Sequence, residues 1–223
     1  MIENELFKYR AWDKFAKDIL ESGRLWISSI EKLNDPFEAT MMSSNEDDTD
    51  RIEELEKYMK IRDKFGIISL SKTANQLLLW SHYGDAHKGV CIGFSGLSKN
   101  TSYSEIKYIT RQPLSHKQPF EILKFKSSHW RYEQEGRLIF NNKKNKHINL
   151  TELNSIISSV TLGLNIDHTH AIKIHSICSE KNIPVYYCMK DKMYRIRRLK
   201  MDHDGLKRFH KIGALKSIVE KYS

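Results

Sequence analysis

Apolar residues recur along this chain with two spacings, one typical of strands and the other typical of helices. Residues 5–9 and 25–28 are predicted to form short strands, and the helical spacing of the apolar residues between them predicts a helix that ends at Ser22-Gly23. Later patterns predict a helix over 45–65, a buried strand over 67–71, a short helix over 75–84 and a strand over 89–94.

Turn and loop signals separate these segments. The sequence LNDPFE at 33–38 predicts a turn, because proline fixes φ and the residue before it disfavours the helical conformation. HWRYEQEGRLIF at 129–140 predicts a turn that leads into a strand over 137–140. Loops are expected at 96–104, 111–119 and 141–147, and from residue 151 the predicted order is helix, strand (160–164), helix (167–181), strand (184–189), strand (193–199) and helix (204–221).

Strands and helices are interspersed without an internal repeat or a linker, which predicts a single α+β domain over residues 1–223. Its sheet should be mixed and largely antiparallel, with flanking helices. The chain has no apolar run near the roughly 20 residues needed to cross a membrane, and its first residues do not resemble a signal peptide, so a cytoplasmic location is expected. The odd count of three cysteines predicts reduced core thiols.

Charge is unevenly distributed around a formal net charge of +9. Residues 1–66 carry 11 basic and 16 acidic side chains, whereas residues 190–223 carry 11 basic and 4 acidic ones. This predicts a basic C-terminal ribbon and helix over 190–223. A cationic face on the ribbon would attract nucleic-acid phosphates, although a solvated edge strand gives the same pattern. The candidate nucleic-acid-binding residues are Arg195, Arg197, Arg198 and Lys200.

The strongest chemical feature is Glu133-Gln134-Glu135, which follows two aromatic residues and precedes a predicted strand. On an extended segment, carboxylates at i and i+2 point to the same face, and their repulsion raises the pKa of one of them. Such a pair beside aromatic walls suits a reaction through a sugar oxocarbenium ion. The alternative is two surface glutamates bonded to Arg131 and Arg137.

A second candidate is the aromatic segment WSHYG, predicted to lie on a short helix that ends at a glycine. Trp80, His82 and Tyr83 there could form a pocket wall, or they could simply pack in the core around a satisfied histidine. The phosphate-loop, GxGxxG, HExxH and GxSxG motifs are absent from the sequence, and the spacing of its histidines does not favour a metal site.

Several segments together resemble a bacterial family, some of whose members are linked to abortive phage infection. They are LFKYR, ILESGRLWIS, LNDPFE, ISLS, WSHYGDAHKGVCIGF and WRYEQEGRL, which occur in the expected order over roughly residues 5–164.

A second resemblance is to the ADP-ribosyltransferases, especially toxins that modify nucleic acid, and it implies an ADP-ribosyltransferase-like fold with a split, mostly antiparallel sheet. Their sites combine a His or Arg on the first strand, a Ser, Thr or Tyr on a central strand, and a catalytic Glu, often within Glu-x-Glu. The resemblance implies that Glu135 is catalytic with Glu133 as its companion. The cofactor-binding candidates that it implies are Lys8, Tyr9 or Arg10 on the first strand and Ser69 or Ser71 in ISLS.

This chain departs from those toxins in carrying Lys8 where they have a histidine, and Arg10 is the preferred substitute because its guanidinium can fork onto a phosphate or ribose oxygen. The implied function is a toxin-like enzyme of phage defence. It would cleave NAD and transfer ADP-ribose to a nucleic acid, with RNA favoured over DNA, and Trp80 or Tyr83 would wall the nicotinamide. An antitoxin or immunity protein would be its partner.

Two other functions stay open. The first is a non-catalytic immunity, antitoxin or nucleic-acid-binding protein that keeps the same fold; burial of Glu133 and Glu135 in salt bridges away from a cleft would favour it. The second is a nuclease, for which the charge is suitable but an Asp/Glu metal cluster is not evident.

Overall fold

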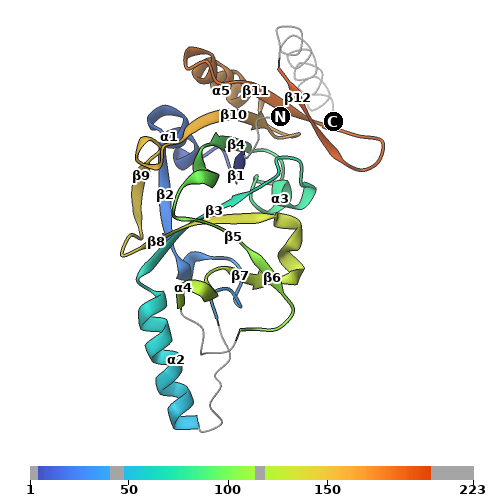
Figure 1. Ribbon diagram of the computed structural model, residues 1–223. Coiled ribbons are helices and arrows are strands. Elements are labelled where there is room, and N and C mark those ends of the chain that lie inside the picture. The colour runs from blue at the N-terminus through green and yellow to red at the C-terminus, as the bar shows by residue number, and fades with distance from the viewer. Residues whose placement is uncertain (1–4, 41–47, 114–118, 202–223) are drawn as a thin grey trace. The chain divides into compact units, whose positions relative to one another are not determined.

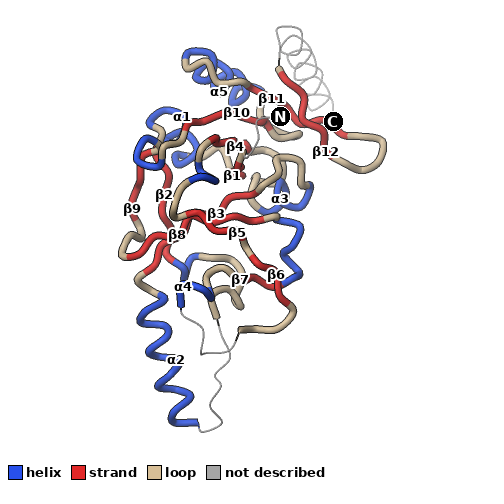
Figure 2. The backbone as a smooth tube through the Cα atoms, viewed as in Figure 1, coloured by secondary structure: helices blue, strands red, loops and turns tan. Residues whose placement is uncertain are grey.

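The computed structural model describes residues 5–40, 48–113 and 119–201, and the contacts between residues divide the chain into two compact units. The first unit is formed by Met1–Leu6, Gly23–Thr73 and Ser95–Ile156, and the second by Phe7–Ser22, Ala74–Phe94 and Ile157–Ser223. Each unit is therefore built from three separate stretches of the chain. The prediction of a single domain stays a prediction. Figures 1 and 2 show the helices and strands of both units.

The first unit contains an antiparallel sheet in the order β5-β8-β3-β2-β9, in which β3 and β8 pair over seven residues each. Its strands are β2 (Arg24–Ser29), β3 (Phe65–Ser71), β5 (Tyr103–Glu105), β8 (Glu135–Asn141) and β9 (Lys146–Asn149).

Two short strands of the same unit, β6 (Lys107–Ile109) and β7 (Phe125–Ser127), form a separate parallel pair. The unit's helices are α2 (Asp48–Arg62) and α4 (Pro119–Ile122). Its 3-10 helices lie at Ile30–Lys32, Leu97–Lys99, Ser128–Glu133 and Thr151–Leu153.

Strand β3 lies at the centre of the first unit because its sequence, FGIISLS, is apolar at nearly every position. A strand with this composition needs cover on both faces. Ile67 of β3 is 1% exposed and belongs to an apolar cluster that also contains Ile30, Ala39, Phe65, Leu123 and Ile139. Loop, strand and helix residues thus meet in one core on this strand.

The strands of the second unit follow the order β12-β11-β10-β4-β1, in which β10 and β11 are parallel and β11 and β12 form an antiparallel hairpin. Its strands are β1 (Leu6–Arg10), β4 (Val90–Ser95), β10 (Ile156–Leu162), β11 (Val185–Lys190) and β12 (Ile196–Lys200). Its helices are α1 (Lys14–Ser22), α3 (Leu77–His82) and α5 (His168–Glu180).

The prediction of a mixed α+β structure with several antiparallel strands is confirmed, and an ADP-ribosyltransferase-like arrangement stays a prediction. The loops predicted at 96–104 and 141–147 contain parts of β5 and β9. The helix predicted from 151 is wrong, because Asn154 adopts a left-handed φ of 50° and ends a single 3-10 turn there. The helix predicted over 204–221 lies outside the described residues.

The three cysteines are buried and none of them forms a disulfide bond, as predicted. Among the described residues, none of the helices combines the length and the apolar character that crossing a membrane requires.

Replacement of Ile67 by alanine should lower the free energy of unfolding by about 2–5 kcal/mol, because it leaves a cavity against β8 and the Leu123 loop. Chemical denaturation measures this loss. Ile52→Ala is a matched control on α2, where the isoleucine is 58% exposed, and it should change stability little. Equal losses in the two variants would contradict the central position of β3.

Candidate functional site

The pairing of β3 with β8 brings the serines of ISLS next to the Glu-x-Glu segment. Ser71 lies opposite Glu135 and Ser69 lies opposite Arg137 in the register of the two strands. The Ser69 hydroxyl hydrogen-bonds the Glu135 carboxyl group, and the Ser71 hydroxyl donates to the backbone carbonyl of Glu133 at 2.7 Å. Residues more than 60 positions apart in sequence are therefore held together by one strand pair.

Lys126 on β7 lies between the two glutamates of that segment. Its ammonium group donates to Glu133 Oε2 at 2.5 Å and to Glu135 Oε2 at 2.9 Å. A third carboxylate, that of Glu38, has its Oε2 atom 3.8 Å from Lys126 Nζ. The Lys126 side chain is only 3% exposed, so this cation is almost entirely surrounded by protein.

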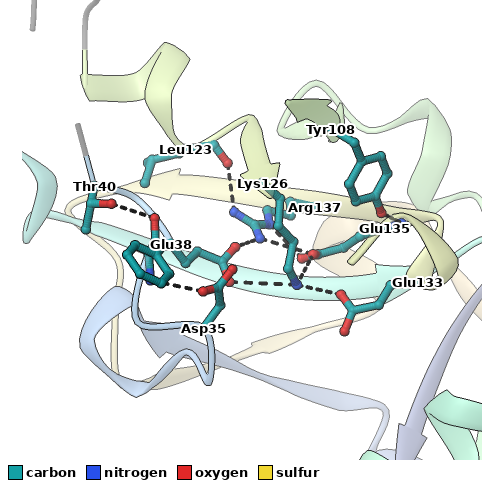
Figure 3. A network of polar contacts seen from close by, with 10 residues as sticks. Asp35, Glu38, Thr40, Tyr108, Leu123, Lys126, Glu133, Glu135 and Arg137 are labelled. Carbon is teal, nitrogen blue, oxygen red and sulfur yellow. Dashed lines mark hydrogen bonds and ion pairs between the residues drawn. The ribbon is translucent and has the colours of Figure 1, made fainter. Parts of the chain in front are cut away.

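Arg137 on β8 is the second buried cation, and its side chain is fully inaccessible to solvent. It forms a bidentate pair with Glu135, from Nε to Oε1 at 2.6 Å and from Nη2 to Oε2 at 3.1 Å. Its Nη1 atom donates to the Leu123 carbonyl at 2.9 Å, and its Nη2 atom contacts Glu38. Figure 3 shows both cations among these carboxylates.

We call these side chains the ion cluster: it consists of Asp35, Glu38, Lys126, Glu133, Glu135 and Arg137. Four carboxyl groups face two cations, and all six residues are buried. Asp35 and Glu38 belong to the LNDPFE segment, where Asp35 Oδ1 accepts the Phe37 backbone N–H at 2.9 Å. That turn is therefore attached to the sheet by charge as well as by its own hydrogen bonds.

Burial shifts the titration of the charged groups in the cluster. It raises the pKa of Glu135; Lys126 and a hydrogen bond from Ser69 act in the opposite direction, and Glu133 adds to the increase. Burial alone would lower the pKa of Lys126, but Glu135 and Glu133 outweigh it and the pKa is raised. Burial lowers the pKa of Arg137 to about 9 against the influence of Asp35, so both cations are charged at neutral pH.

The prediction that Glu133 and Glu135 lie on one extended segment is wrong. Glu133 ends a 3-10 turn, and Gln134 adopts a left-handed φ of 46° before β8 begins at Glu135. Tyr108 Oη accepts the Glu135 backbone N–H at 2.7 Å and helps to fix this bend. The alternative of surface glutamates is also wrong, because each is 4% exposed, although Glu135 does pair with Arg137.

A cleft of about 360 Å³ lies beside the ion cluster in the first unit, and Lys126 forms part of its wall. Gln112 Nε2 donates to Thr40 Oγ1 at 2.9 Å within it. Neither Glu133 nor Glu135 lines this cleft. Most of the remaining wall surface is apolar and includes Phe37, Ile109 and Phe125. Arg111 and His129 are among its charged or polar groups. We call it the Lys126 cleft.

The first-strand candidates all belong to the second unit. Tyr9 is 7% exposed, its hydroxyl accepts the Gln76 backbone N–H at 3.4 Å, and burial raises its pKa. The Arg10 guanidinium pairs with Asp13 at 3.1 Å, and Lys8 is half-buried. The prediction that these residues meet Ser69 and Glu135 in one cleft stays a prediction.

The three residues of the WSHYG segment have different environments in the second unit. Trp80 is fully buried, its indole N–H donates to the Ala74 carbonyl at 3.0 Å, and its ring contacts that of Tyr9 edge-on at 5.1 Å. Trp80 is thus a core residue in this structure. His82 is exposed and Tyr83 half-buried, with ring centroids 6.1 Å apart.

The candidate nucleic-acid-binding residues divide between the two faces of β12, so the expectation of one cationic face is wrong. Arg195 and Arg197 are exposed and share Asp191 as ion-pair partner. Arg198 is half-buried, and its guanidinium lies 3.8 Å from the ring centroid of Tyr186. Lys200, two residues beyond Arg198, is exposed. Because side chains alternate along a strand, Arg195 and Arg197 share one face, and Arg198 and Lys200 share the other.

Sequence reasoning missed Asp35, Glu38 and Lys126. The available signal was the position of these charges within otherwise apolar or turn-forming segments, where a solvated charge is out of place. In the part of the chain that the structure describes, no group of three or more His, Cys, Asp or Glu side chains is arranged to hold a metal ion.

Comparison with models of protein families, with curated proteins and with solved structures finds no match.

Arg137→Met should lower the free energy of unfolding by about 3–5 kcal/mol, because it leaves buried carboxylates without their partner. Lys72→Met is the control, since the Lys72–Glu105 pair at 2.5 Å involves side chains that are 40% and 66% exposed. Lys72→Met should lower the free energy of unfolding by about 1 kcal/mol or less. Chemical denaturation of both variants compares the two, and similar small losses would show that the cluster does not hold the unit together.

Glu135→Gln should gain stability relative to the wild type as the pH rises above about 4.5, the ordinary pKa of a glutamate. The raised pKa means that the folded protein keeps a proton on Glu135 that the unfolded chain loses, so wild-type stability falls across this interval. Denaturation of both proteins at a series of pH values measures the difference in unfolding free energy. A difference that moves in the opposite direction would show that the cations dominate over burial.

Proposed function

We propose that this chain is an ADP-ribosyltransferase that breaks the nicotinamide–ribose bond of NAD and transfers ADP-ribose to a nucleic acid, RNA rather than DNA. The observation that carries the proposal is the hydrogen bond between Ser69 and Glu135 on paired strands, with Glu133 beside them. A serine on a central strand next to a Glu-x-Glu segment is the combination that the resemblance to ADP-ribosyltransferases implies.

The proposed reaction needs a carboxylate close to the ribose. As the bond between C1′ and the nicotinamide nitrogen breaks, its electron pair leaves with nicotinamide and positive charge develops on the ribose. Glu135 would stabilise that charge in a site of low dielectric. A lone pair of the acceptor then forms the new bond to C1′, and the acceptor's proton passes to Glu133 or to solvent.

The ion cluster gives Lys126 and Arg137 different parts in this proposal. Both neutralise Glu135, which would weaken its effect on a developing cation. Arg137 is held by Leu123 and Glu38 as well, whereas Lys126 has a flexible stem and already forms part of the wall of the Lys126 cleft. Movement of Lys126 into the cleft would remove one of the two hydrogen bonds to Glu135 Oε2 and one neutralising charge, while Arg137 keeps the carboxylate oriented.

A non-catalytic protein of the immunity, antitoxin or nucleic-acid-binding kind is the second candidate. The observation that favours it is the burial of both glutamates in ion pairs, together with their absence from the wall of the Lys126 cleft. In that case the cluster serves only to stabilise the fold. A role in cytoplasmic phage defence, with an antitoxin as partner, belongs to the first proposal.

Glu135→Gln should reduce transfer of ADP-ribose by about two orders of magnitude or more, because it keeps the volume of the side chain and removes its charge. Glu133→Gln should cost less if that residue only orients the acceptor or the ribose. The measurement is incorporation of labelled NAD into total cellular RNA, DNA and protein. It identifies the acceptor at the same time.

Glu105→Gln on β5 is the matched control, since this glutamate is exposed and pairs only with Lys72 among the ion pairs described. Its activity should equal that of the wild type. Expression in growing cells should be toxic for the wild type and the control and harmless for Glu135→Gln at equal abundance. If folded Glu135→Gln labels its acceptor as strongly as the wild type, the result would contradict the transferase proposal and support the non-catalytic function.

A further inference from the structure

The tip of the β11–β12 hairpin presents an aromatic ring to solvent between basic residues. Tyr194 is 96% exposed, and its φ of 56° is left-handed, a conformation that tyrosine seldom adopts. Asp191 fixes the turn: its Oδ1 atom accepts the Met193 N–H at 3.1 Å, and its carbonyl accepts the Tyr194 N–H at 3.2 Å. The turn therefore holds the ring away from the protein. Figure 1 shows the hairpin in orange to red.

A groove of about 400 Å³ runs from this tip to the start of α3, all of it within the second unit. We call it the hairpin groove. Arg195 and Arg197 form one part of its lining with Tyr194, and Asn75 and Gln76 supply two amide groups. Asp191 Oδ2 accepts a hydrogen bond from Arg197 Nε at 2.6 Å and lies 3.4 Å from Arg195 Nη2.

We infer that the hairpin groove seats an unpaired nucleotide of a single-stranded nucleic acid, with the base stacked on Tyr194. This rests on the proposed function, in which nucleic acid is the acceptor. The two guanidinium groups would bind the flanking phosphates, because Asp191 engages one nitrogen of each and an arginine has five N–H donors. The amides of Asn75 and Gln76 are donors and acceptors suited to the edge of a base.

The exposed ring decides between kinds of anionic partner. Segment 190–200 has six basic residues and one acidic residue, which would attract an acidic protein surface as well as a nucleic acid. Acidic side chains would use only the charge, whereas a nucleotide also uses the ring face and the amides. A base within a duplex is already stacked on its neighbours, so the ring selects a single strand.

The experiment measures binding without NAD, so its result does not depend on whether the chain cleaves NAD. Fluorescence anisotropy compares a short labelled oligouridylate with an abasic oligomer of the same length and charge. The wild type should prefer the oligouridylate. Tyr194→Ala should weaken oligouridylate binding by roughly tenfold and remove the preference, because stacking on an aromatic ring is the interaction lost. Tyr194→Trp should retain it.

Lys192→Ala is the matched control, because it removes an exposed charge from the same hairpin without changing the lining of the groove. This variant should weaken the binding of both oligomers to the same small extent. An unchanged preference in Tyr194→Ala would overturn the inference. Binding of polyglutamate as tight as that of the oligouridylate would also overturn it, in favour of an acidic protein partner.

Discussion

The first unit depends on two cations that are almost entirely buried, Lys126 and Arg137. They join three segments of the chain: the LNDPFE turn, the short strand β7 and the start of β8. Burial of so many charges is costly, and it is tolerated only where each carboxylate finds a cation. The cluster therefore makes these segments interdependent: removing one charge leaves its partners buried with one ion pair fewer.

The same contacts set a conflict at Glu135. The geometry that fixes its orientation also neutralises it, since Arg137 takes both carboxylate oxygens and Lys126 takes one of them again. For the proposed transfer, the resting arrangement has to be a closed form from which Lys126 departs. For the non-catalytic function, it is the final form. The two candidate functions thus differ in whether the Lys126 ammonium group moves, and both are compatible with the same fold.

Much of the fold could be predicted from the sequence, because an apolar run such as that of β3 and a helical spacing such as that of α5 are visible in the sequence itself. Short strands such as β7 could not, since three residues give no period and their pairing is set by contacts distant in sequence. Glu133 and Glu135 were found as a pair, whereas the bend at Gln134 and the partner Lys126 were not. Ion pairing between segments leaves no local pattern, and a charge predicted as exposed can be the centre of a core.

Strand β8 places Gly136 between the two residues that matter most to the cluster. A β-carbon there would lie 2.5 Å from the ring of Tyr103, so a larger residue at this position would require the Tyr103 side chain to move. We therefore expect Glu135, Gly136 and Arg137 to be retained or replaced together during evolution. A descendant that loses Lys126 should survive only with an accompanying loss of an acidic residue at 38 or 133, so these distant positions should vary together.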